Sequence, residues 1–195
     1  MNVDEFIQTY TLSKADFIMF KWNRKHGKDL IDENLHTRRE IIKYIESVNF
    51  QNVPGELLRD LLIAEAYYSK ESWGIYRHYH RLAENLIRQT GATYLDDYLI
   101  SAFLSFDTYC STLVADLSGV EIDDYINEIN VRKANATTND QSMLKTYEKG
   151  IELFLSYKVN QNRENEFDRE IIIPSQLKGF KKFLGFIKKA FSRKA

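Results

Sequence analysis

A three- and four-residue spacing of apolar side chains is the feature that most constrains this chain. Such spacing places side chains on one face of an α-helix, whereas a strand alternates every two residues. Between Thr93 and Ser118 the apolar positions are Leu95, Tyr98, Leu99, Ala102, Phe103, Phe106, Tyr109, Cys110, Leu113, Val114 and Leu117. Ser105 and Asp107 leave open a break that divides this segment into two helices.

The same spacing recurs along most of the first 160 residues. We expect a helix opened by a capping box at Ser13 and Asp16, and another that begins at Pro54. Further helices are predicted at 32–48, 69–90, 122–129 and 144–155. The sequence therefore predicts an all-α fold, either an irregular antiparallel helix bundle or a short stack of helix pairs, with a C-terminal basic amphipathic helix.

Composition is consistent with one compact helical domain and an appendage. Hydrophobic residues make up 44% of the 195, which is enough to bury a core without disulfides. Cys110 is the single cysteine and is interpreted as a small core residue in a reducing compartment. We expect a helical domain at 1–160, a polar linker at 161–174 and the basic amphipathic helix at 175–195.

The last 21 residues differ sharply in charge from the rest. They contain seven basic residues and no acid, whereas residues 1–174 contain 20 basic and 28 acidic residues, a net charge of −8. On a helical wheel the lysines separate from an apolar, aromatic face. The residues expected to contact a partner or a membrane are Leu177, Lys178, Phe180, Lys181, Lys182, Phe183, Leu184, Ile187, Lys188, Lys189 and Phe191.

This helix has three interpretations. Its apolar face completes the domain core, or its lysines lie along the acidic body, or it binds a partner or an anionic membrane surface. Nucleic acid ranks third among the partners, because a body of net −8 repels the phosphate backbone.

No motif for catalysis, a cofactor or a metal is found in the sequence. His36 with Glu40 and His80 with Glu84 have the spacing of two ligands on one helix face, but no third ligand follows. Asp96–Asp97 and Asp123–Asp124 are interpreted as residues at helix N-termini. An unrecognised helical hydrolase or nuclease would need Glu65, His78 or His80 to meet arginines in one pocket.

From about Glu56 to Glu152 the order of features resembles a family of small bacterial helical proteins of unknown function. The matching positions are Leu61–Leu62, Trp73, Tyr109–Cys110, Leu113, Leu117, Asp124–Tyr125 and Asp140–Gln141. Members resemble helical-repeat proteins, and some resemble immunity proteins encoded beside toxins. The resemblance implies protein binding and transfers no catalytic residue.

The preferred hypothesis is a non-enzymatic bacterial protein-binding module, an immunity or accessory factor for a toxin, whose acidic body suits a basic partner. The alternative is a peripheral membrane protein anchored by the C-terminal helix. The N-terminus lacks the pattern of a secretory signal, so the cytoplasm is the expected location. No cofactor is expected.

Overall fold

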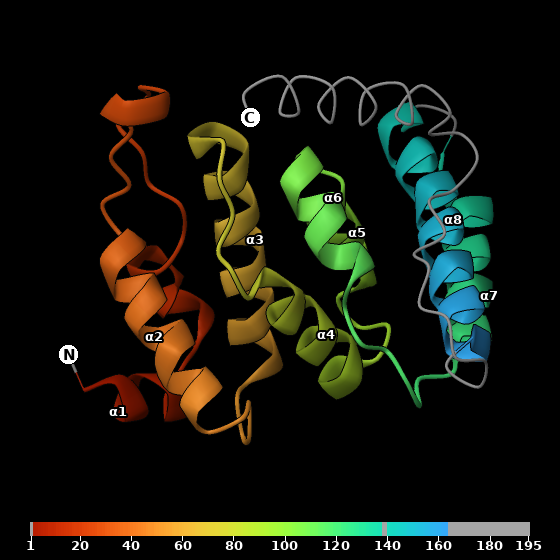
Figure 1. Cartoon of the computed structure of the whole chain (residues 1–195), viewed down its shortest axis with the longest axis horizontal. Coiled ribbons are helices and arrows are strands. Elements are labelled where there is room, and N and C mark those ends of the chain that lie inside the picture. Colours follow the sequence, from red (N-terminus) through yellow and green to blue (C-terminus); the bar gives the residue numbers. More distant parts are fainter. Residues whose placement is uncertain (1, 138–139, 164–195) are drawn as a thin grey trace, which may run out of the picture.

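The computed structural model describes residues 2–137 and 140–163, and these residues form an all-α fold (Figure 1). This confirms the predicted fold class. Within the described ranges, the only β-type pairing is an isolated antiparallel bridge between Trp22 and Asp32. The helices are α1 (Val3–Gln8), η1 (Leu12–Phe17), η2 (Gly27–Asp29), α2 (Leu35–Ser47), α3 (Gly55–Ser72), α4 (Tyr79–Thr90), α5 (Leu95–Ala102), α6 (Phe106–Leu113), α7 (Ile122–Asn135) and α8 (Gln141–Arg163), where η denotes a 3-10 helix.

The helices follow one another across the molecule in nearly the order of the chain, from α1 and α2 at one end to α7 and α8 at the other (Figure 1). Helix α3 packs against α4 and α5, and α4 packs against α6. The α7–α8 pair is antiparallel. Its ends are marked by the ion pairs Lys133–Glu148 at 3.1 Å and Lys158–Asp123 at 2.6 Å.

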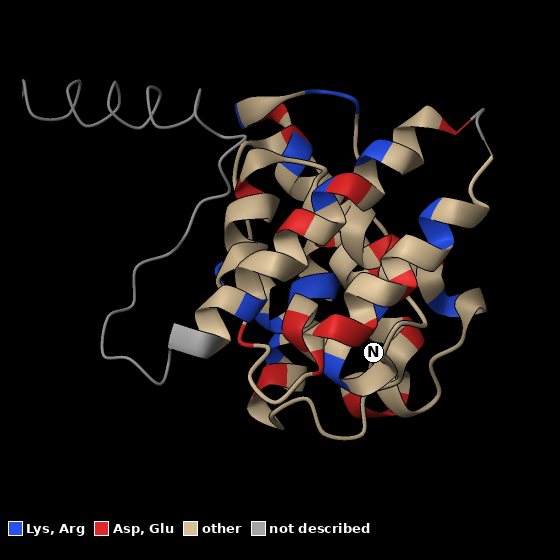
Figure 2. Cartoon of the chain, turned by 90° about the vertical axis from the view of Figure 1, so that its right-hand side faces the viewer, with Lys and Arg blue, Asp and Glu red and all other residues tan. Residues whose placement is uncertain are grey.

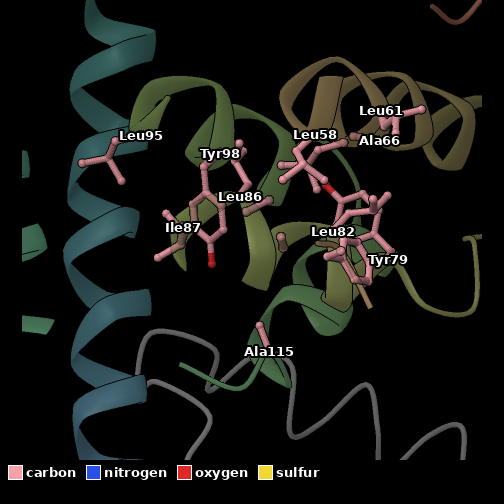
Figure 3. Close-up of a cluster of buried hydrophobic side chains, with 14 of the residues drawn as sticks. Leu58, Leu61, Ala66, Tyr79, Leu82, Leu86, Ile87, Leu95, Tyr98 and Ala115 are labelled. Atoms are coloured by element: carbon pink, nitrogen blue, oxygen red, sulfur yellow. The ribbon is translucent and has the colours of Figure 1, made fainter. Parts of the chain in front are cut away.

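The centre of the core lies between α3, α4 and α5 (Figure 3). Leu58 and Leu61 of α3 are completely buried together with Leu82 and Leu86 of α4 and Tyr98 of α5. Each fully buried leucine contributes roughly 1.5–3 kcal/mol through the removal of apolar surface from water. The apolar spacing seen in the sequence therefore produces the face that each of these helices buries.

Buried hydroxyl groups connect the core to α8. The hydroxyl groups of Tyr98 and Tyr157 lie 2.9 Å apart, and Tyr157 donates to the carbonyl oxygen of Thr112 at 2.6 Å. Burial raises the pKa of both tyrosines, so both keep their protons for these hydrogen bonds. Beside them, the rings of Tyr125 and Phe154 stack at 5.2 Å between centroids and join α7 to α8.

The helix predicted at 69–90 is wrong. Ser69 belongs to α3, which ends at Ser72, and α4 begins at Tyr79. The break lies at Trp73, which has the left-handed backbone angles φ 60° and ψ 33° and an 85% exposed side chain. The apolar spacing continues across the break by coincidence, because Trp73 does not lie on a buried face.

The predictions for the N-terminal region also need correction. Residues 12–17 form a 3-10 helix that begins after Thr11, and no side chain caps it, so the capping box at Ser13 and Asp16 is absent. Trp22 lies in the isolated bridge and not on a helix. The helix predicted at 32–48 begins three residues later, because α2 starts at Leu35 and Asp32 lies in the preceding segment, with its carboxylate buried against Arg38.

The break left open near Ser105 is confirmed. Helix α5 ends at Ala102, and Ser105 caps α6 by accepting a hydrogen bond from the backbone N–H of Thr108 at 3.1 Å. Helix α8 continues to Arg163, past the expected end of the domain at residue 160. Among the described helices, none combines the length and apolar character needed to cross a bilayer.

Candidate functional site

A buried arginine on α2, Arg38, joins this helix to α3 and to the segment between η1 and α2. Arg38 is completely buried, and its Nε donates to Glu65 Oε1 at 2.7 Å. Its Nη2 donates to Asp32 Oδ2 at 2.6 Å, and its Nη1 donates to the carbonyl oxygen of Ile18 at 3.0 Å. Both carboxylates are themselves buried. The guanidinium thus has a partner for each of its three nitrogens, which offsets the cost of burying its charge.

Asp32 fixes the loop that carries the first aromatic residues of the candidate site. Its Oδ1 accepts hydrogen bonds from the backbone N–H groups of Lys21 at 3.1 Å and Asn34 at 3.2 Å. The bridge between Trp22 and Asp32 holds the two sides of the loop together. As a result, Phe20, Trp22 and His26 have defined positions beside α3.

Arg39, the next residue of α2, lies between two tyrosines. Its guanidinium carbon is 4.8 Å from the ring centroid of Tyr68 and 5.5 Å from that of Tyr76. Its Nη2 lies 3.4 Å from Glu65 Oε2, and its side chain is 30% exposed. The buried Nε has no hydrogen-bond partner among the described residues. Cation–π contact with two rings replaces part of the hydration that the guanidinium loses.

Ring contacts extend from Arg39 in both directions. On one side the ring of Tyr68 meets Phe20 at 6.4 Å, Phe20 stacks on Trp22 at 5.8 Å, and Trp22 meets His26 at 5.1 Å. On the other side Tyr76, His78 and His80 follow at 5.9 and 6.2 Å. We call this continuous set the aromatic strip: Phe20, Trp22, His26, Arg39, Tyr68, Tyr76, His78 and His80. Each of its members is half-buried except His26, which is exposed.

Two glutamates pair with two of the three histidines of the strip. His26 Nδ1 lies 3.2 Å from Glu71 Oε2, and His78 Nδ1 lies 2.9 Å from Glu46 Oε1. Glu46 also accepts a hydrogen bond from the hydroxyl of Tyr76 at 3.1 Å. Burial, with Glu46 nearby, raises the pKa of Tyr76 to about 12. Glu71 also lies 3.9 Å from the ammonium of Lys70. Both carboxylates are therefore paired with neighbouring side chains, and neither is free at the surface of the strip.

The structure brings together only some of the residues considered for catalysis. Glu65 meets Arg38 and Arg39 but is completely buried, so a substrate does not reach its carboxylate. His78 lies further along the strip and pairs with Glu46 instead, and the ring of His80 contacts that of His78. Burial, with His78 and Arg81 nearby, lowers the pKa of His80.

No group of three metal-ligating side chains is found within residues 2–137 and 140–163. His36 and Glu40 form a pair at 3.4 Å, and both are largely exposed. Cys110 is half-buried rather than fully enclosed, and burial raises the pKa of its thiol. Asp96–Asp97 and Asp123–Asp124 lie in the first turns of α5 and α7, as predicted.

The residues predicted to contact a partner or a membrane, Leu177 to Phe191, lie outside the described residues. Sequence reasoning missed Arg39, Tyr68 and Phe20, which connect the strip. The sequence did carry a signal for this region, namely a high content of aromatic residues and histidine. Leaving out the buried Tyr79, six of the fourteen residues at 67–80 are tyrosine, tryptophan or histidine.

Charge is divided unevenly along the described chain. Residues 2–91 contain 13 basic and 13 acidic residues, whereas residues 92–163 contain 6 basic and 11 acidic ones. Figure 2 views the molecule from the α7–α8 end, with acidic residues in red and basic residues in blue. The acidic excess therefore belongs to the end of the molecule that lacks the strip.

Comparison with protein-family models, with curated proteins and with solved structures finds no match.

Proposed function

We propose that this chain is a non-enzymatic protein-binding module and that the aromatic strip is its binding surface. The observation that carries the proposal is the unbroken series of ring contacts around Arg39, which runs from the exposed His26 through half-buried rings to His80. Tryptophan, tyrosine and arginine are the residues that most often dominate binding energy at protein interfaces.

The strip is also held ready for binding. Its loop is fixed by the buried Asp32, its centre by Glu65, and its far end by Glu46. A partner that covers these rings would gain apolar contact at a small cost in side-chain entropy, since their positions are already defined. An immunity or accessory factor for a toxin is the specific form of this function that we propose.

The proposal is tested by co-purification. The tagged full chain is expressed with the products of neighbouring genes, and a stable complex is expected. Trp22→Ala should weaken that complex by about 2 kcal/mol or more, roughly 30-fold in affinity, if the strip is the centre of the interface. His26→Ala provides a second variant, because His26 is 63% exposed at the side chain and its loss spares the fold.

The matched control is Val131→Ala on α7, an apolar residue that is 54% exposed at the other end of the molecule. Its complex should equal the wild type. Repeated failure to find a partner, or a partner retained at full affinity by both strip variants, would reject the proposal.

A hydrolase is the second candidate function, and the 2.9 Å Glu46–His78 pair favours it because a carboxylate can orient a histidine as a general base. The full chain and His78→Gln are assayed on p-nitrophenyl acetate and bis-p-nitrophenyl phosphate. Turnover that disappears in His78→Gln would support this candidate, and equal background rates in the two proteins would reject it.

A further inference from the structure

We infer that the segment which binds the aromatic strip is an acidic, apolar stretch of another protein. This inference rests on the proposed function and adds the chemistry of the partner. It depends on which charges at the borders of the strip are exposed and which are already paired.

Five cations border the strip and are exposed: Arg24, Lys25, Lys28, Lys43 and Arg77. Arg24 and Lys25 lie between Trp22 and His26, and Lys28 is in the same loop. Arg77 lies between Tyr76 and His78, and Lys43 is one helical turn beyond Arg39. None of the five forms an ion pair with a described residue.

The carboxylates of this region offset that charge only in part. Glu40, next to Arg39 on α2, is 56% exposed at the side chain and lies 3.4 Å from His36. Glu65 is buried between two arginines, while Glu46 and Glu71 have side chains that are only 14% and 16% exposed and face histidines. Glu33 pairs with Lys21 at 2.7 Å. Residues 20–31 contain four basic residues and one acid, Asp29, a net charge of +3.

The charge of the rest of the molecule also favours the binding of an acidic partner at the strip. Residues 92–163 have a net charge of −5, so they repel an acidic partner, while the borders of the strip attract it. Opposite potentials at the two ends of a molecule orient the partner during its approach. An acidic segment is thus directed towards the strip, where its apolar side chains meet the rings and its carboxylates meet the five cations.

A nucleic acid fits the strip less well. Bases bind to open ring faces, but Phe20 and Trp22 already stack on each other, and the ring of Tyr68 contacts both Phe20 and Arg39.

The inference is tested by fluorescence anisotropy with the full chain and four labelled probes. These are the peptides (Glu-Phe-Glu-Leu)3, (Glu-Ser-Glu-Ser)3 and (Lys-Phe-Lys-Leu)3, and a 15-nucleotide oligo-U. The acidic apolar peptide should bind most tightly of the four. Arg77→Glu and the triple variant Arg24→Gln, Lys25→Gln, Lys28→Gln should each weaken its binding about tenfold.

The matched control is Lys145→Glu on α8, which makes the same charge change at an exposed position of the acidic end. It should leave binding unchanged. Tighter binding of the basic peptide or of oligo-U, equal effects of Arg77→Glu and Lys145→Glu, or no binding of the acidic apolar peptide up to about 1 mM would overturn the inference. A co-purified partner that binds the strip through a basic segment would preserve the proposed function and reject only this inference.

Discussion

Arg38 shows how one buried charge organises the N-terminal third of the chain. Asp32 and Glu65 surround it, and Arg39 shares Glu65, so two positive and two negative charges lie together. Such a cluster is stable only when it is complete, because an unpaired charge in the interior is poorly compensated. The sequence named Glu65 as a residue that could meet arginines, but it did not identify Arg38, Arg39 or Asp32 as its neighbours, because the four residues are spread over 34 positions.

Replacing Arg38 by methionine is expected to destabilise the protein by about 3–5 kcal/mol, because Asp32 and Glu65 would remain buried without their cation. The free energy of unfolding is measured by urea denaturation. Lys133→Met, which breaks the partly exposed pair with Glu148, is the control and should cost no more than about 1 kcal/mol. Equal effects of the two substitutions would show that the Arg38 cluster is not a stabilising unit.

His80 should make stability depend on pH. Burial lowers its pKa below the ordinary 6.5, and His78 and Arg81 act in the same direction. The unfolded chain therefore binds the proton at a higher pH than the folded one. Stability is complete above about pH 6.5 and falls as the pH drops towards the folded pKa.

The urea midpoint of the wild type should thus decrease from pH 7 to pH 5, and His80→Gln should reduce that slope. His36→Gln, at a side chain that is 84% exposed, should keep the wild-type slope. An NMR titration that places the pKa of His80 at or above 6.5 would contradict the prediction.

At the scale of the helices, spacing predicted where most apolar faces lie but not where every helix ends. The break at Ser105 was foreseen because serine is a known cap and forms one here. The break at Trp73 was not foreseen, because a left-handed backbone is expected at glycine, and the chain offers Gly74 only one residue later. The strip depends on that break, since it releases Tyr76 and His78 from a helix and brings them to Glu46.

Trp73→Gly is expected to stabilise the protein by about 1 kcal/mol. Glycine adopts the φ of 60° without the strain that a side chain creates there, and an 85% exposed ring loses little burial. For a chain of this size the melting temperature should rise by about 2–4 °C.

The reverse substitution serves as the control. Gly91 has φ 58° and ψ −137° at the end of α4, with open space around an added Cβ, so Gly91→Ala tests backbone strain alone. It should cost about 1–3 kcal/mol. A lower melting temperature for Trp73→Gly would mean that the exposed ring contributes more than its strained backbone costs.

At the scale of the whole molecule, the sequence predicted a body with net negative charge, but it did not predict how that charge is distributed between the two ends. The count over 174 residues hides the neutral charge of residues 2–91 and the acidic charge of residues 92–163, which lie towards opposite ends of the molecule (Figure 1). The strip could not be predicted, because its members come from the loop before α2, from α2, from α3, from the connection between α3 and α4, and from α4. Only the packing of those elements brings them together.

The membrane alternative predicts that the full chain floats with vesicles of phosphatidylserine and phosphatidylcholine. Each lysine near an anionic surface contributes about 1 kcal/mol, so the basic residues beyond Pro174 would support reversible binding. Phe183→Glu with Ile187→Glu should abolish flotation. Val131→Glu with Leu155→Glu, at two exposed apolar positions of the body, should not. If the wild type stays in the unbound fraction, the membrane alternative is rejected.

The progression of the helices across the molecule has a consequence for how such a chain can change. The rings and cations at one end are specified by residues 20–80, and the acidic excess at the other by residues 92–163. Over generations, substitutions on the outer faces of α7 and α8 can therefore accumulate while the surface around Arg39 is inherited intact. A descendant protein can therefore gain a new binding preference at the α7–α8 end while the strip at the other end keeps its own.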